Sequence, residues 1–134
     1  MQKLKILITG ADGMLASDFI NTQSEKYEVI PVNKKECDIT SFESILQSIS
    51  LYEPDILLNT AAYTNVEDAE DIDMLRCYEV NTLGIKNLAK ATAVFGVVLI
   101  TLSTDYVFDG LQKSGYLPSD PCNPLNNYGM SKYL

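Results

Sequence analysis

The sequence predicts an α/β protein with a Rossmann-type, doubly wound parallel sheet. Short apolar strand candidates alternate with helical segments along the 134 residues, a pattern typical of right-handed βαβ crossovers. A glycine-containing turn, "ITGADGMLA", separates the first expected strand from the first expected helix. Residues 97–103 are apolar almost throughout, which favours a strand covered on both faces. We expect strand order 3-2-1-4 in this sheet.

The first half of the chain is expected to hold two strands and two helices. Residues 5–9 ("KILIT") form a short strand candidate, and a helix is expected over residues 14–22. A second strand is expected at residues 28–32 ("EVIPV"), where the proline indicates a weak or frayed end. Thr40 is typical of a helix N-cap and Glu43 completes a capping box, so a second helix should begin there. The apolar face of that helix comprises Phe42, Ile45, Leu46 and Ile49.

The second half is expected to continue the alternation. A third strand is expected at residues 55–60 ("DILLNT"), followed by a long helix over residues 73–95 that ends at Gly96. The strand at residues 97–103 precedes a polar loop that contains two glycines and three prolines. The final segment, "NYGMSKYL", begins another helix. We expect this helix and the fourth strand to expose apolar surface, which promotes self-association.

The composition excludes several classes of function. The formal net charge of -8 argues against nucleic acid or an anionic membrane as partner, because both favour a basic surface. The chain contains no histidine, so Ser-His-Asp hydrolysis and His-ligated zinc cannot be built from it alone. Acid–base chemistry must then use tyrosine, lysine or carboxylates. Three widely spaced cysteines in no CxxC arrangement are typical of reduced thiols and favour a cytoplasmic location.

Gly10 and Gly13 lie in the turn between the first strand and the first helix. Gly10 permits a tight turn, and Gly13 would let the backbone approach a pyrophosphate at the helix N-terminus. Ala16 holds the third small position of the pattern. Because a strand–helix turn can need glycines for its own geometry, the turn alone leaves both interpretations open.

The residue that reads the adenosine ribose should lie near the end of the second strand. Asn33 holds that position and is followed by Lys34 and Lys35. The missing carboxylate and the adjacent positive charge favour NADP, because a basic side chain can bind the 2′-phosphate. A solvated lysine pair at a loop tip explains the same residues, and use of both NADPH and NADH stays open.

Tyr128 and Lys132 are four residues apart, so on a helix they share a face. A nearby ammonium favours the ionised form of a phenol, so the pair makes a general acid that can protonate a carbonyl oxygen. The lysine can also bind ribose hydroxyls. Thr104 follows the fourth strand, at the edge where open α/β sheets bind ligands, and its hydroxyl could contact the same carbonyl oxygen. Ordinary loop capping is the alternative role for Thr104.

Together these motifs resemble the dTDP-4-dehydrorhamnose reductase family of extended short-chain dehydrogenases/reductases. The resemblance runs through "ILITGADGMLA", "CDIT", "NTAAYTNVEDAE", "VNTLGIKNLA", "STDYVFDG" and "NPLNNYGMSK". The segments "AAYTNVEDAE" and "STDYVFDG" are specific to this branch, whereas the glycine turn and YxxxK belong to the whole superfamily. The resemblance implies reduction of the 4-keto group of dTDP-4-dehydro-L-rhamnose to dTDP-L-rhamnose by NADPH or NADH, with NADPH slightly favoured.

The resemblance also implies roles for individual residues. The implied catalytic residues are Thr104, Tyr128 and Lys132. The implied cofactor contacts, besides Asn33, Tyr128 and Lys132, are Gly10, Asp12, Gly13, Met14, Leu15, Asp38, Ile39, Ala61, Ala62 and Tyr63. Within that set Asp38 and Ile39 would lie against the adenine, and residues 61–63 would line the path to the nicotinamide. Val107 and Phe108, with Thr104, would approach the sugar. Some family members use Mg²⁺ at a dimer contact, but no metal-binding residue is assigned here.

Members of this family continue for about as long again as this chain. We therefore interpret residues 1–134 as a truncated NAD(P)-binding Rossmann domain whose C-terminal substrate-binding part is absent, and expect little turnover from it alone. The full-length parent would bind a nucleotide-sugar and could form a homodimer. One alternative is a non-catalytic member that resembles the regulatory subunit of methionine adenosyltransferase; another is a bare Rossmann-type binding domain. Retention of the three implied catalytic residues favours the enzyme.

Overall fold

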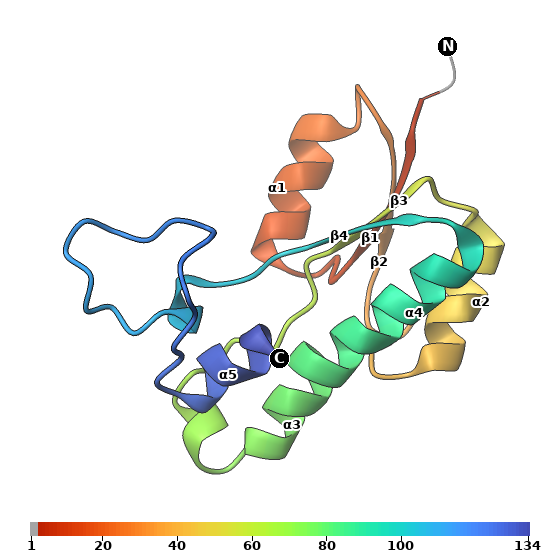
Figure 1. Ribbon diagram of the computed structural model, residues 1–134. Coiled ribbons are helices and arrows are strands. Elements are labelled where there is room, and N and C mark those ends of the chain that lie inside the picture. The colour runs from red at the N-terminus through yellow and green to blue at the C-terminus, as the bar shows by residue number, and fades with distance from the viewer. Residues whose placement is uncertain (1–2) are drawn as a thin grey trace. The chain divides into compact units, whose positions relative to one another are not determined.

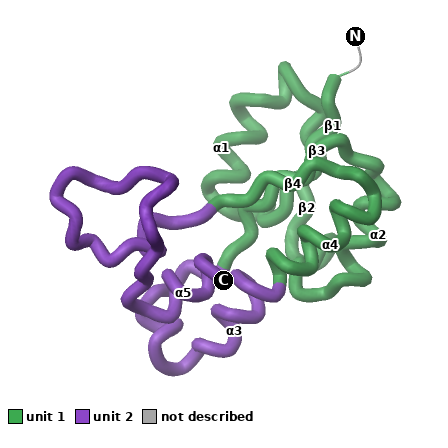
Figure 2. Tube along the Cα trace, in the orientation of Figure 1, with its two compact units in different colours: residues 1–62, 84–102 green, residues 63–83, 103–134 purple. Residues whose placement is uncertain are grey.

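The computed structural model describes residues 3–134, which form two compact units (Figure 2). Unit 1 comprises the described part of residues 1–62 together with residues 84–102, and unit 2 comprises residues 63–83 and 103–134. Within residues 3–134, none of the helices is both long enough and apolar enough to cross a membrane.

Unit 1 is built on a four-stranded parallel sheet (Figure 1). Its strands are β1 (Lys5–Thr9), β2 (Glu28–Val32), β3 (Ile56–Asn59) and β4 (Val98–Thr101). Their order in the sheet is β2-β1-β3-β4, so the parallel Rossmann-type sheet is confirmed but the predicted order 3-2-1-4 is wrong. The crossover after β2 passes back over β1, and β3 pairs with the free side of β1.

Two sequence features explain this order. Pro31 cannot donate a backbone hydrogen bond, which suits β2 to an edge of the sheet. The apolar residues of β1 are almost completely buried, as expected for a strand with neighbours on both sides. The chain adds β2 on one side of β1 and then β3 on the other side, so the direction in which strands are added reverses between β1 and β3. Open α/β sheets bind ligands at such a switch point, outside the carboxyl ends of the strands.

Three helices cover the two faces of the unit 1 sheet (Figure 1). Helix α1 (Met14–Gln23) lies on one face, and α2 (Phe42–Tyr52) and α4 (Ile85–Phe95) pack together on the other. This arrangement follows from right-handed crossovers. The expected face of α2 is confirmed in Ile45 and Ile49, which are fully buried, whereas Phe42 at its start is exposed.

The start of α2 differs from the prediction by one residue. Ser41 is the N-cap, and its side chain accepts a hydrogen bond from the Ser44 backbone N–H. The predicted capping box is wrong because the Thr40 hydroxyl instead donates to Asp38, and the Glu43 carboxylate accepts from Gln47. Thr40 and Glu43 thus each bond to a side chain near them in sequence instead of forming a capping box. Their spacing alone does not distinguish these two arrangements.

Strand β4 is shorter and more exposed than expected. Val98 and Ile100 are 57% and 45% exposed, so the prediction of a strand covered on both faces is wrong for this chain. β4 pairs only with β3 and forms an edge of the sheet. The predicted exposure of apolar surface at this strand is confirmed, and its consequence for self-association stays a prediction.

The helix expected over residues 73–95 is divided into three parts. Helix α3 (Met74–Tyr78) leads into a π-helical segment, η2 (Glu79–Gly84), and α4 follows. Gly96 ends α4 in the left-handed conformation with φ 69, as predicted. π-helical turns inside longer helices often occur at functional sites, because they turn additional side chains towards one neighbour.

Unit 2 contains short helices around α5 (Asn127–Tyr133). The 3₁₀ helices η1 (Asp68–Glu70) and η3 (Asp105–Val107), together with α3, contact α5. Apolar Ala69, Cys77 and Val107 are buried in this unit, as are the polar residues Asn81 and Ser131. A long irregular loop connects η3 to α5.

Candidate active site

The glycine turn of unit 1 has the backbone geometry that the sequence predicts. Gly10 adopts a left-handed φ of 74, and a Cβ at this position would lie 2.7 Å from the backbone nitrogen of Ala61. Only glycine allows this conformation together with this close approach. The chain that leaves β1 therefore passes directly against the chain that leaves β3, at the topological switch point.

The N-terminus of α1 presents a place for an anion. Gly13 is the N-cap and its position has no side-chain cap hydrogen bond, so no side chain occupies the backbone N–H groups of the first turn there. These groups and the helix dipole favour negative charge. Met14 and Leu15, in this first turn, are exposed, while Ala16 is fully buried beneath them. The turn and helix terminus thus fit the pyrophosphate of a dinucleotide.

A buried polar chain fixes the carboxyl edge of the sheet. The Thr9 hydroxyl at the end of β1 donates to the Asn59 side chain over 2.6 Å. The Asn59 amide donates to Thr101 at the end of β4 and to the Ala61 carbonyl, each over 3.2 Å. These bonds tie three strand ends together where a ligand would bind. Sequence reasoning missed Asn59, although a polar residue at the end of an apolar strand is a signal for it.

Asn33 has a structural role at the end of β2. Its side chain accepts hydrogen bonds from the backbone N–H groups of Lys35 and Glu36. Its own N–H donates to the Glu36 carboxylate over 2.9 Å. An acid therefore does lie beside the predicted ribose-reading position, although it is three residues further along the chain than expected. Lys34 and Lys35 are exposed, in agreement with either interpretation of the lysine pair.

The remaining cofactor residues implied for unit 1 differ in accessibility. Asp12 is exposed, Ala61 is half-buried and Ala62 is exposed. Asp38 is half-buried, and its carboxylate accepts hydrogen bonds from the N–H and hydroxyl of Thr40. The Ile39 side chain is buried, so a ligand would chiefly contact the Ile39 backbone. These roles stay proposals.

Tyr128 and Lys132 both lie within α5 of unit 2, one turn apart and on the same helix face. Asn126 caps the helix: its side chain accepts from the Gly129 N–H over 2.7 Å. Tyr128 and Lys132 are each half-buried. Burial lowers the pKa of Lys132 from its usual value, and the nearby Cys77 acts in the opposite direction.

Gly129 brings α5 against η3. A Cβ on this residue would lie only 2.2 Å from the Tyr106 carbonyl oxygen, so no other residue fits without moving the two elements apart. The Tyr106 ring meets the Tyr128 ring edge to face, with centroids 5.5 Å apart. Sequence reasoning missed both residues. A glycine inside a helix was the available signal, because glycine destabilises a helix unless packing requires it.

Thr104 is the N-cap of η3. Its hydroxyl donates to the Asp105 carboxylate over 3.3 Å and accepts from the Tyr106 N–H over 3.3 Å. The capping role that the sequence left open is therefore present, and the proposed catalytic role stays a prediction. Of the residues implied to approach the sugar, Val107 is buried and Phe108 is half-buried.

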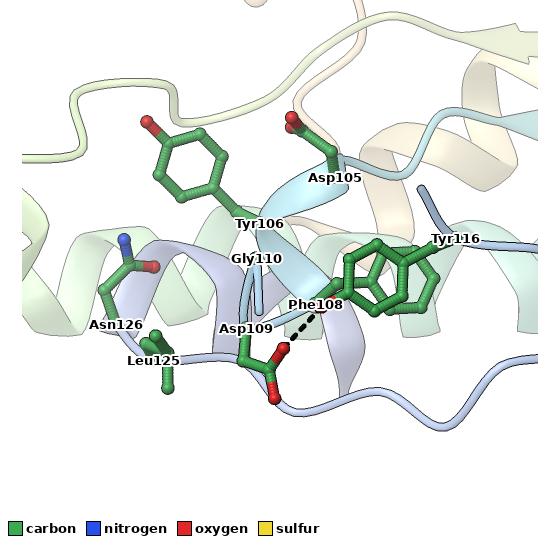
Figure 3. A pocket seen from close by; sticks show the side chains of 8 residues that line it. All are labelled: Asp105, Tyr106, Phe108, Asp109, Gly110, Tyr116, Leu125 and Asn126. Atoms are coloured by element: carbon green, nitrogen blue, oxygen red, sulfur yellow. Dashed lines mark hydrogen bonds between the residues drawn. The ribbon is translucent and has the colours of Figure 1, made fainter. Parts of the chain in front are cut away.

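An open pocket of about 340 Å³ adjoins this segment within unit 2 (Figure 3). Its lining includes Asp105, Tyr106, Phe108, Asp109, Tyr116 and Asn126. The Phe108 and Tyr116 rings stack with centroids 4.3 Å apart. The Tyr116 hydroxyl donates a hydrogen bond to the Asp109 carboxylate over 2.5 Å. This bond contributes most among several hydrogen bonds that together lower the pKa of Asp109 to about 2.

Tyr63 begins unit 2 and belongs to the implied cofactor residues. Its hydroxyl donates to the Asp73 carboxylate over 3.2 Å. Burial first, and then this hydrogen bond, raise the pKa of Tyr63 to about 12. The raised pKa makes the Tyr63 phenol a weaker acid than an unperturbed tyrosine.

The sequence-predicted residues thus divide between the two units. Unit 1 holds the glycine turn and the end of β2, for which dinucleotide binding is predicted. Unit 2 holds Thr104, Tyr128 and Lys132, for which proton transfer is predicted, and also Tyr63. The family model described as RmlD substrate binding domain matches residues 4–134, nearly the whole chain.

The chain belongs to the RmlD substrate binding domain family. It is 36% identical over 130 residues to dTDP-4-dehydrorhamnose reductase of Aggregatibacter actinomycetemcomitans, with 96% of this chain and 44% of the relative covered. It is 36% identical to the spore coat polysaccharide biosynthesis protein SpsK of Bacillus subtilis, over 97% of this chain and 46% of that protein. The chain therefore spans about half the length of the curated relatives it matches.

Solved structures support the same family. The crystal structure of dTDP-4-dehydrorhamnose reductase from Bacillus anthracis in complex with NADP has a TM-score of 0.92 and 37% identity, covering 99% of this chain and 47% of that one. UDP-glucose 4-epimerase from Brucella ovis in complex with NAD has a TM-score of 0.88 at 18% identity, covering 97% of this chain and 45% of that one, and shows the shared fold alone.

Proposed function

We propose that the full-length protein carrying this chain reduces the 4-keto group of dTDP-4-dehydro-L-rhamnose to dTDP-L-rhamnose. The observation that carries this proposal is the pairing of Tyr128 with a half-buried Lys132 on one face of α5. The sugar comes from the relatives, several of which are named dTDP-4-dehydrorhamnose reductase. We place the reaction in the cytoplasm, where nucleotide-sugars and reduced nicotinamide cofactors are available.

The cofactor is proposed to be NADPH or NADH, with NADPH favoured by Lys34 and Lys35 and by the NADP bound to the Bacillus anthracis relative. In unit 1 the glycine turn and the N-terminus of α1 would hold its pyrophosphate, with Gly10 and Gly13 keeping the backbone free of side chains. The further implied contacts are Asp12, Met14, Leu15, Asn33, Asp38, Ile39, Ala61, Ala62, Tyr63, Tyr128 and Lys132. When bound, the nicotinamide supplies the hydride that the ketone carbon receives.

Tyr128 is proposed to be the proton donor. As the keto group becomes an alcohol, the Tyr128 hydroxyl transfers its proton to the carbonyl oxygen, and solvent later restores that proton. The Lys132 ammonium, one turn away, stabilises the phenolate that remains. Burial lowers the pKa of Lys132 and so disfavours its ammonium form, but it also strengthens the attraction between that ammonium and a nearby phenolate, because charges in a partly dry site interact more strongly than in water.

Thr104 is proposed to hold the same carbonyl oxygen through a hydrogen bond. Its hydroxyl donates to Asp105 over 3.3 Å, a long hydrogen bond that is easily exchanged for a substrate oxygen. Its acceptor bond from the Tyr106 N–H can remain when the donor changes partner. Val107 and Phe108 continue the segment that would approach the sugar.

No metal-binding residue is assigned in this proposal. Among the residues that the structure describes, there is no group of three His, Cys, Asp or Glu side chains that could hold one.

The test is NADPH oxidation by the full-length protein, followed at the nicotinamide absorbance with dTDP-4-dehydro-L-rhamnose as substrate. We expect turnover with the keto sugar and none with dTDP-L-rhamnose in its place. NADH should be compared in parallel, because the residues after β2 leave both cofactors open. Absence of turnover with either cofactor, in protein that binds NADPH, would favour the non-catalytic alternative.

A further inference from the structure

We propose that Asn81 and Thr82 are positioning residues for Tyr128 and Lys132, because together they hold Ser131, which lies between these two residues in α5. The proposal rests on the proposed function. All of the residues involved belong to unit 2. We refer to Asn81, Thr82 and Ser131 as the Ser131 clamp.

Ser131 receives hydrogen bonds from two consecutive residues of η2. The Asn81 amide donates to the Ser131 hydroxyl oxygen over 3.0 Å, and the Thr82 hydroxyl donates to the Ser131 backbone carbonyl over 2.8 Å. Successive side chains of an α-helix point in directions about 100° apart. The π-helical turn of η2 accommodates both contacts with a single neighbour.

The Asn81 amide is fully used by this arrangement. Its oxygen accepts from the Tyr63 N–H over 2.8 Å, and its nitrogen donates to the Tyr63 carbonyl over 3.0 Å as well as to Ser131. Asn81 is 3% exposed, so loss of any partner would leave a buried polar group unsatisfied. The amide therefore holds the segment at Tyr63 and helix α5 in one fixed arrangement.

Ser131 connects these hydrogen bonds to helix α5, which contains Tyr128 and Lys132. Its hydroxyl donates to the Tyr128 carbonyl over 2.7 Å, and its oxygen lies 3.2 Å from the Cys77 sulfur of α3. The side chain is completely buried. A hydroxyl that bonds within its own helix and accepts from a neighbouring one fixes the rotation of α5, and with it the directions of Tyr128 and Lys132.

The chemistry of the proposed reaction gives this fixed rotation a function. A proton donor must lie within hydrogen-bond reach of the carbonyl oxygen, and misplacement by 1 Å costs about 100-fold in rate. Tyr128 and Lys132 therefore need a fixed orientation in α5. Side-chain hydrogen bonds from η2 supply it.

The experiment compares Thr82→Val with Thr82→Ser in the full-length protein. Valine keeps the shape of threonine but removes the donor to Ser131, whereas serine retains the hydroxyl. We expect Thr82→Val to lower kcat about 10-fold with KM for the sugar unchanged, and Thr82→Ser to keep kcat within about twofold of the wild type.

Thr92→Val is the matched control. Thr92 lies in α4 of unit 1, is buried whereas Thr82 is half-buried, and donates its hydroxyl to the Leu88 carbonyl over 2.9 Å. Thr92→Val, like Thr82→Val, loses a hydrogen bond from a hydroxyl to a backbone carbonyl, but this carbonyl lies in α4 and not in α5. Its kcat should therefore equal that of the wild type. Melting temperatures of the three variants separate a loss of folded protein from a loss of rate.

The outcomes distinguish this inference from the function on which it rests. An active wild type with full kcat in Thr82→Val, or with equal losses in Thr82→Val and Thr92→Val, would overturn the positioning role alone. A wild type that binds NADPH but never reduces the sugar would overturn the proposed function and the positioning role together.

Discussion

The two units are stabilised by different kinds of core. In unit 1 the buried side chains are mostly large and apolar, including Leu7, Ile8, Ile45, Ile49, Leu57 and Leu88. In unit 2 the buried apolar side chains are Ala69, Cys77 and Val107, and Asn81 and Ser131 are buried beside them. Apolar packing tolerates small changes of direction, whereas hydrogen bonds have fixed lengths and angles.

The difference matches what each unit is proposed to do. Unit 1 offers backbone N–H groups at a helix terminus, and a layered apolar core is sufficient to hold a strand, a turn and a helix in order. Unit 2 is proposed to direct the Tyr128 phenol at the substrate's carbonyl oxygen and to hold the Lys132 ammonium near that phenol. Its directional hydrogen bonds provide that accuracy at the cost of hydrophobic stabilisation.

The largest effect is expected from Tyr128→Phe in unit 2. Phenylalanine keeps the ring that packs against Tyr106 but has no proton to give. We expect kcat to fall about 100- to 10,000-fold in the full-length protein, with no change in melting temperature. Steady-state NADPH oxidation measures this. Turnover close to that of the wild type would end the assignment of Tyr128 as proton donor.

In unit 1, Leu57→Ala should lower stability rather than rate. Leu57 is fully buried in β3, so the truncation leaves a cavity and lowers the free energy of unfolding by about 2–5 kcal/mol. Chemical denaturation followed by circular dichroism measures the change. Leu51→Ala is the control, because Leu51 is 72% exposed on α2 and should cost far less. Equal losses at the two positions would contradict an apolar core in unit 1.

Gly129→Ala tests how closely α5 and η3 must pack. Its methyl group would meet the Tyr106 carbonyl, so we expect a loss of about 1–3 kcal/mol in the free energy of unfolding together with a lower kcat. Gly96→Ala in unit 1 is the comparison: there φ is 69 but no atom lies within 4 Å of the added Cβ. That variant should lose about 1 kcal/mol and keep its kcat. The account would be wrong if Gly129→Ala kept full activity.

A smaller effect is expected from acid on the loop of unit 2. Because hydrogen bonds lower the pKa of Asp109 from 3.8 to about 2, the Asp109 carboxylate stabilises the folded loop above pH 3.8. This contribution is lost as the pH falls through about 2. Asp109→Asn should remove this part of the pH dependence, as measured by the melting temperature between pH 2 and pH 5. An unchanged dependence in that variant would contradict it.

Local features of unit 1 could be predicted from the sequence. The bounds of β1 and β2 agree with the prediction, and the turn at Gly10 and the cap at Gly96 have the expected backbone conformations. Each depends on a few neighbouring residues, so a local pattern contains the necessary information. The strand order was predicted wrongly, although Pro31 already indicated that β2 belongs at an edge.

The supporting residues of unit 2 could not be predicted in the same way. Asn81 and Ser131 are 50 residues apart, and no periodicity connects them. YxxxK led to the prediction for Tyr128 and Lys132, but nothing near them in sequence shows that side chains of η2 bond to the helix. The apolar run of β4 supported two opposed predictions, cover on both faces and exposed apolar surface, and only the second is confirmed, because an apolar run does not reveal what covers it.

The central claim is that the glycine turn of unit 1 binds the pyrophosphate of the cofactor and that Tyr128 of unit 2 donates the proton. Calorimetric titration of NADPH into the full-length wild type, Gly13→Val and Tyr128→Phe tests it most directly. A side chain at Gly13 would block the helix terminus, so Gly13→Val should lose binding, whereas Tyr128→Phe should bind within about tenfold of the wild type. Undiminished binding by Gly13→Val, or loss of binding in Tyr128→Phe alone, would contradict this division between the units.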